Sequence, residues 1–103
     1  MVPIRSSYET DPEMLEIVCD FARELPAHAA RLESLLASRV FADLQRLAHQ
    51  LKGAGGGYGF DQITESAGLL EQALKSGAPE PVLKDRTAEL CAVLRAVVAP
   101  ERR

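Results

Sequence analysis

The sequence contains no tryptophan, and only 5% of its residues are aromatic. A core without large aromatic side chains has to be filled by Leu, Val, Ile and Ala, a composition that favours helices. The chain also lacks a surplus of positive charge: its formal net charge is -3, and no cluster of Lys or Arg is dense. A basic footprint for a phosphate backbone is therefore missing, and we expect no nucleic-acid partner.

Long apolar runs are scarce as well. None approaches the roughly 18 residues that a membrane-spanning helix needs, and residues 1–7 hold no apolar stretch typical of a secretory signal. We therefore expect a cytoplasmic protein without a membrane segment.

The two cysteines, Cys19 and Cys91, lie far apart within apolar helical patterns. We interpret them as buried free thiols, with a disulfide or a metal role as the alternatives.

The pattern of apolar residues predicts an all-α chain. With 103 residues the sequence suffices for one domain, predicted over 1–103, in which residues 1–10 form a short leader. Beyond the leader, apolar side chains recur at steps of three and four over 14–36, 40–51, 63–74 and 83–97. Four such helices with short connections predict an antiparallel up-down-up-down four-helix bundle, with room for a short extra helix before the first.

Several residues predict where these helices begin and end. Thr10 and Glu13 have capping-box spacing, which places the start of the first helix there. Pro26 interrupts the same apolar face and predicts a kink or a tight restart. A run of glycines predicts that the second helix stops between residues 57 and 59, and Pro100 predicts that the fourth ends near residue 99.

His49 lies on the polar side of the second predicted helix. At about 100° per residue, it lies roughly 150° from the centre of the apolar positions, so its imidazole is expected in solvent. The same arithmetic places five residues beside it: Gln45, Arg46, Lys52, Gly53 and Gly56. The glycines would leave bare helix surface for the approach of another protein, with a cation close to the imidazole.

An exposed imidazole beside a cation is suited to attack on phosphorus. A neutral ring has one nitrogen free to attack while the other holds the proton, and Lys52 could offset the charge of the phosphoryl group. The alternative is an ordinary solvated histidine on a surface helix. The glycine run does not favour a nucleotide-binding loop, because it follows a helix and lacks the Gly-Lys-Ser/Thr ending.

Two segments resemble the hallmark of histidine-containing phosphotransfer (HPt) domains. Ala48-His49-Gln50-Leu51-Lys52-Gly53 resembles the family's Ala-His-x-Leu-Lys-Gly core, and Leu70-Glu71 resembles a Leu-Glu segment on the family's next helix. Residues 12–36 resemble the family's upstream helix, so that the resemblance covers nearly the whole chain. Residues 54–57 depart from it, because the family more often has Ser or Ala and fewer glycines there.

The resemblance implies a role for each matching residue. His49 would accept the phosphoryl group, Lys52 would help to hold it, and Gly53 would permit docking. Glu71 would accept a hydrogen bond from the other imidazole nitrogen and so fix the tautomer, although spacing alone also fits a solvated carboxylate on a helix face. Lys75, one turn further on, would add positive potential near the phosphate.

The resemblance also implies a function. The chain would be a phosphorelay carrier in two-component signalling that works with receiver domains and a hybrid sensor kinase, and not an enzyme. A monomer is what we expect of a compact bundle with polar outer faces. It would need no cofactor or metal, since Mg²⁺ belongs to the receiver, and Ile17 would support docking. Two alternatives stay open: a non-phosphorylated helical adaptor that regulates a receiver or kinase, and a metal-binding bundle that uses His49, Glu71 and His28.

Overall fold

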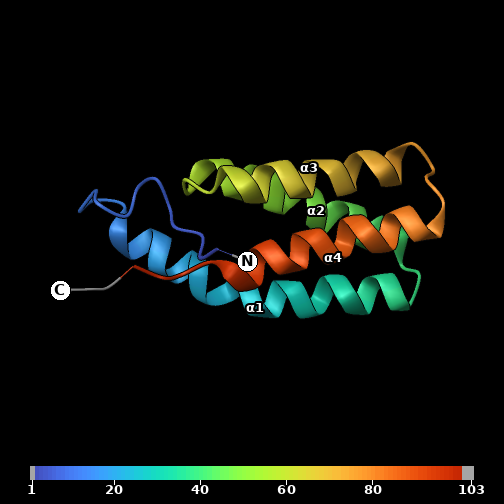
Figure 1. The fold of residues 1–103 in the computed structure, drawn as a ribbon, viewed down its shortest axis with the longest axis horizontal. Helices are drawn as coiled ribbons and strands as arrows, with labels where there is room; N and C mark the ends of the chain where they lie inside the picture. The colour runs from blue at the N-terminus through green and yellow to red at the C-terminus, as the bar shows by residue number, and fades with distance from the viewer. Residues whose placement is uncertain (1, 101–103) are drawn as a thin grey trace.

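The computed structural model describes residues 2–100, which form four helices in antiparallel up-down-up-down order (Figure 1). The helices are α1 (Leu15–Ala37), α2 (Phe41–Gly57), α3 (Asp61–Lys75) and α4 (Glu80–Ala96). Extended pairing within residues 2–100 is limited to one isolated bridge. The predicted all-α four-helix bundle is confirmed. None of the helices in the described part combines the length and apolar character that crossing a bilayer requires.

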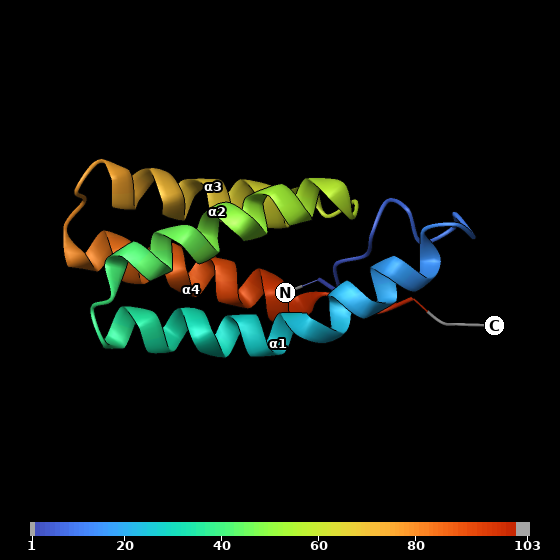
Figure 2. The same cartoon turned by 180° about the vertical axis from the view of Figure 1, so that it is seen from behind.

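Aliphatic side chains fill the core, as the scarcity of aromatic residues predicts. Every helix contributes fully buried leucines, among them Leu25, Leu44, Leu70 and Leu90. Cys19 and Cys91 are buried free thiols, as expected, and burial raises the pKa of Cys91 to about 11. α2 packs chiefly on α3, whereas α4 contacts both α1 and α3. α2 therefore keeps one side open to solvent, and Figure 2 shows it on the near side of the bundle.

α1 begins later than its sequence predicts. It starts at Leu15, and the capping role predicted for Thr10 is wrong: the side chain of Asp11 accepts a hydrogen bond from the backbone N–H of Glu13 at 2.9 Å within a turn. α1 then continues through Pro26 without a restart. An interior proline costs about 3 kcal/mol. The fully buried apolar face of α1 on both sides of Pro26 offsets that cost.

Ile4 and Val97, near the two ends of the described chain, pair with each other, and this shortens α4. α4 ends at Ala96 instead of near residue 99, because Val97 turns to extended backbone and forms a parallel bridge with Ile4. The backbone N–H of Ile4 donates to Ala96 O at 2.9 Å, and Ile4 is buried in the core. The segment predicted as a leader thus packs on the bundle, as far as residues 2–10 are described, and no helix precedes α1 there.

Glycines bring α2 and α3 close together. α2 ends at Gly57, within the predicted range, and Gly59 makes the turn with φ 82°. A side chain at Gly59 would come within 2.6 Å of Ser7 Oγ. At Gly55 an added Cβ would lie 2.8 Å from Thr64 Oγ1 and 2.9 Å from the Thr64 backbone nitrogen. Only glycine permits this approach, which places the last turn of α2 against the first turn of α3.

Candidate functional site

His49 projects from the middle of α2 on its open side. Its side chain is 67% exposed, while Leu44, Ala48 and Leu51 of the same helix are buried in the core. Because these residues fix the rotation of α2, they also fix the direction in which the imidazole points. The exposure predicted for His49 is confirmed.

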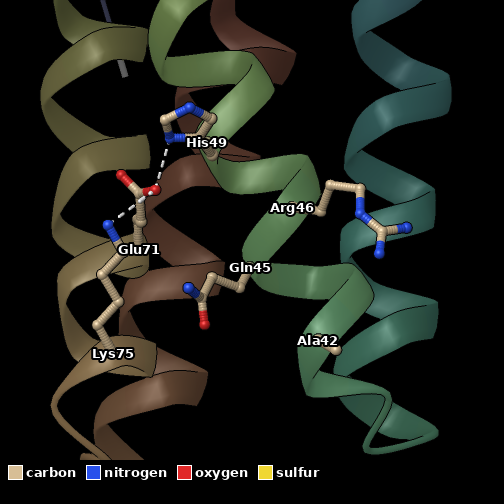
Figure 3. Close-up of a pocket in the computed structure, with 6 residues that line it drawn as sticks. All are labelled: Ala42, Gln45, Arg46, His49, Glu71 and Lys75. Atoms are coloured by element: carbon tan, nitrogen blue, oxygen red, sulfur yellow. Dashed lines mark hydrogen bonds and ion pairs between the residues drawn. The ribbon is translucent and has the colours of Figure 1, made fainter.

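Glu71 of α3 meets His49 across the helix pair. Its carboxylate Oε2 lies 2.6 Å from His49 Nδ1, as Figure 3 shows by a dashed line. The Glu71 side chain is only 5% exposed, so the alternative of a solvated carboxylate on a helix face is wrong. A buried carboxylate needs partners that donate hydrogen bonds or carry positive charge.

Two lysines provide the remaining partners of Glu71. Lys52 Nζ donates to Glu71 Oε1 at 2.9 Å, and Lys75 Nζ lies 3.4 Å from Oε2. The hydrogen bond from Lys52 lowers the pKa of Glu71 to about 2, against the opposing effect of burial; the hydrogen bond with His49 acts in the same direction as Lys52. Glu71 is therefore ionised at neutral pH and can only accept hydrogen bonds.

The ionised carboxylate selects one tautomer of His49. Because Glu71 only accepts, the hydrogen of a neutral ring must sit on Nδ1, and Nε2 keeps its lone pair. Figure 3 shows the second ring nitrogen on the side turned away from Glu71. The site therefore presents an exposed imidazole with a nucleophilic nitrogen, and the hydrogen bond between the other ring nitrogen and Glu71 holds the ring in place.

Gln45 and Arg46 lie on the N-terminal side of His49, beside the imidazole. A shallow pocket next to the imidazole is lined by Ala42, Gln45, Arg46, His49, Glu71 and Lys75 (Figure 3). Arg46 points away from Glu71 and pairs with Asp43 at 3.3 Å. Lys75, one turn beyond Glu71 on α3, also lines this pocket.

The two predicted docking glycines have different surroundings. A Cβ added at Gly53 would meet no atom within 4 Å, so the surface one turn after His49 is open. A Cβ at Gly56 would lie 3.6 Å from Thr64 Oγ1, which places Gly56 at the edge of the contact with α3. Open surface next to the imidazole is therefore supplied chiefly by Gly53.

A comparison of the chain with known families identifies its family. The Hpt domain family model matches residues 16–99. The chain belongs to the Hpt domain family. Searches of curated proteins and of solved structures found no match. Hpt domains act in two-component phosphorelays as histidine phosphotransfer carriers, together with receiver domains and kinases.

Two of the predicted residues lie away from the centre of this Hpt domain's site. Ile17 is 45% exposed on the end of α1 that reaches beyond Phe21, whose ring stacks on Tyr58 after the end of α2. His28 lies on α1, with Nε2 3.8 Å from Glu24. Within residues 2–100 no group of three His, Cys, Asp or Glu side chains is arranged to hold a metal ion. The structure therefore gives no support to a metal site that includes His28.

Sequence reasoning missed two residues that place Lys52 in the Hpt site. Thr64 Oγ1 of α3 donates to the backbone carbonyl of Lys52 at 2.9 Å. A Cβ added at Gly68 would lie 3.4 Å from Lys52 Cδ, so the lysine chain crosses bare backbone of α3 on its way to Glu71. The available signal was a glycine three residues before Glu71, which lies one turn away on the same helix face.

Proposed function

We propose that His49 accepts a phosphoryl group on Nε2 from the aspartyl phosphate of one receiver domain and passes it to the aspartate of another. The observation that carries this proposal is the 2.6 Å contact between His49 Nδ1 and the buried carboxylate of Glu71, which leaves Nε2 free on an exposed ring. An imidazole held in this tautomer is ready to attack without first losing a proton.

The transfer needs few groups from the carrier itself. The lone pair of Nε2 bonds to phosphorus as the aspartate oxygen–phosphorus bond breaks, and the electron pair of that bond stays on the aspartate carboxylate. The phosphoryl group brings about two negative charges. Lys52 and Lys75, whose side chains are 42% and 52% exposed, support its retention by charge-assisted hydrogen bonds.

The docking surface is the open side of α2. Gly53 lets a receiver approach the imidazole closely, with Gly56 at the edge of this surface and Gln45 and Arg46 on the opposite side of His49. Ile17 adds an apolar contact further along the bundle.

The receiver contributes Mg²⁺ and the acidic pocket that stabilises the phosphoryl group in transfer. The proposed carrier therefore has no cofactor of its own and no autonomous catalytic activity, and we propose that it is a monomer. A hybrid sensor kinase in the cytoplasm is the proposed source of the phosphoryl group.

Replacement of each histidine in turn tests the proposal. We expect the parent protein and the His28→Gln control to acquire an acid-labile phosphoryl group from a phosphorylated receiver, whereas His49→Gln acquires none. Equal labelling of His49→Gln and the parent would contradict the proposal. Receiver binding that survives His49→Gln, with no phosphohistidine formed in the parent, would favour the adaptor hypothesis instead.

A further inference from the structure

A pocket between α1 and α4 lies away from His49. Its volume is about 460 Å³, and the side chains that line it come from residues 33–37 of α1 and 80–88 of α4. Both views of the bundle show these two helices side by side (Figures 1 and 2). The pocket next to His49 is lined by α2 and α3 alone, so the two pockets share no residue. A volume of this size suits a small molecule.

Thr87 contributes a hydroxyl group without a hydrogen-bond partner to this pocket. The residue is 2% exposed, and in the described part of the chain no other buried side-chain nitrogen or oxygen lacks a partner. A threonine inside a helix can donate to the carbonyl one turn before it, but Thr87 Oγ1 makes no such bond. Burial of an unpaired hydroxyl costs free energy. An acceptor bound in the pocket would offset that cost.

Lys84 carries the unpaired charge of the pocket. Each acid that lines the pocket already has an arginine. Arg95 Nη1 donates to Glu33 Oε2 at 3.1 Å. Arg39 Nη1 donates to Glu80 Oε2 at 2.6 Å. Lys84 makes no ion pair with a described residue, and its longer-range attraction lowers the pKa of Glu80 less than the hydrogen bond from Arg39 does. One positive charge is therefore left to pair with a ligand.

Apolar side chains complete the pocket. Leu36 and Ala37 line it from α1, and Ala88 lines it from α4. Lys84 and Thr87 are three residues apart on α4, which places them one turn apart on the same side of the helix. The pocket thus combines apolar walls with a hydroxyl donor and a single unpaired ammonium group in neighbouring positions.

We propose that this pocket binds a small organic monocarboxylate. The carboxylate accepts hydrogen bonds from Thr87 Oγ1 and Lys84 Nζ. The apolar part of the ligand packs against Leu36, Ala37 and Ala88. A second negative charge would find no further unpaired cation among the described residues that line the pocket. The inference does not depend on the proposed function, because it uses no residue of α2 or α3.

A titration of the whole chain with pentanoate, followed through its ¹H–¹⁵N amide signals, tests the proposal. We expect saturable shifts at the amides of Ala37, Lys84 and Thr87, with a Kd of about 1 mM, as suits a ligand of this size. The amide signal of His49 should stay unchanged. Pentanol and pentylamine are the controls, because they keep an apolar chain and lack the negative charge. Pentanol should bind at least about fivefold more weakly, and pentylamine more weakly still.

Three results of this titration would overturn the proposal. The first is the absence of a saturable shift up to about 20 mM pentanoate, well above the expected Kd. The second is equal affinity for pentanoate and pentanol. The third is a set of shifts centred on Lys52 and Lys75 in place of the α1–α4 pocket, which would mean that the carboxylate only pairs with exposed cations near His49.

Lys84→Gln and Arg86→Gln are matched variants on the same helix. Both remove a cation of α4, but Arg86 pairs with Glu89 at 3.2 Å and does not line the pocket. We expect Lys84→Gln to bind pentanoate about fivefold more weakly than the parent, and Arg86→Gln to bind it like the parent. Equal affinity of Lys84→Gln and the parent would overturn the proposal.

Thr87→Val tests the hydroxyl group, because valine keeps the shape of threonine and removes the oxygen. We expect the urea midpoint of unfolding to rise, since a buried hydroxyl without a partner is removed, and the affinity for pentanoate to fall about tenfold. A lower midpoint would mean that the hydroxyl is paired in the free protein, and an unchanged affinity that the ligand does not reach it; either result contradicts the proposal. Lys84→Gln keeps the proposal testable if Thr87→Val fails to fold.

Discussion

Gly53 and Gly55 stand two residues apart on α2 and have opposite surroundings. A Cβ at Gly55 would come within 3.0 Å of Thr64 and Ile63 on α3, whereas a Cβ at Gly53 would meet nothing within 4 Å. The two glycines mark the two sides of the same helix. One side is packed on α3 as closely as backbone allows, and the other is left bare next to His49.

The comparison shows at which position the contacts of the fold offset the free-energy cost of a glycine in a helix. Each glycine in a helix interior costs about 1 kcal/mol relative to alanine. At Gly55 the close contact with α3 offsets this cost, since it brings Glu71 within reach of His49. Gly53 has no such compensation within the described chain. Its cost therefore points to a requirement outside the fold, which the proposed docking of a receiver domain supplies.

Gly55→Ala should have the largest effect on stability. The new methyl group would collide with the backbone nitrogen of Thr64, which cannot rotate away, so α2 and α3 would have to separate. We expect the free energy of unfolding to fall by about 2 kcal/mol in urea titrations, within the range for overpacked cores. Retained or increased stability would show that the packed side of α2 tolerates a side chain, and the contrast with Gly53 would disappear.

Lowering the pH should remove a contribution that Glu71 makes to the free energy of unfolding. The pKa of Glu71 is lowered from 4.5 to about 2 in the folded protein, chiefly by the Lys52 hydrogen bond. A depressed folded pKa gives stability that is present above about pH 4.5 and is lost as the pH falls toward about 2. We expect Glu71→Gln to be less stable than the parent by about 1.5 kcal/mol at pH 7, the magnitude of a hydrogen bond to a charged group.

Urea titrations of the two proteins at several pH values check this expectation. The stability difference should shrink between about pH 4.5 and pH 2. Glu33 and Glu80, whose pKa values are lowered by hydrogen bonds from Arg95 and Arg39, are present in both proteins, so their titration cancels in the comparison. A difference that stays constant down to about pH 2 would contradict the role assigned to the Glu71 charge.

The open side of α2 was predictable from sequence because it follows from helical periodicity alone. The buried positions Leu44, Ala48 and Leu51 fix the rotation of α2, and that rotation puts His49 in solvent whatever the other helices do. The number and order of the helices follow from the same periodicity. The contact between His49 and Glu71 was expected only through the family resemblance, and the hydrogen bond from Lys52 to Glu71 was not predicted, since both contacts join two helices.

The packed side was not predictable, because it depends on contacts between segments far apart in the chain. The glycine run indicates a weak helix end, but it does not say that Gly55 touches Thr64 while Gly53 touches nothing. The end of α4 was misplaced for a similar reason: Val97 leaves the helix to pair with Ile4, more than ninety residues away in sequence. Local patterns carry no information on such partners.

Gly53→Ala should have the smallest effect on stability, and its sign should be opposite to that of Gly55→Ala. The added methyl group enters open space and favours the helix, so we expect a gain of about 0.5–1 kcal/mol in the free energy of unfolding. The same methyl group lies one turn from His49, where it should slow phosphoryl transfer from a receiver. Gly57→Ala is the matched control, because it also enters open space but lies two turns from His49. A Gly53→Ala protein that is more stable and transfers at the parental rate would show that docking does not need the bare surface.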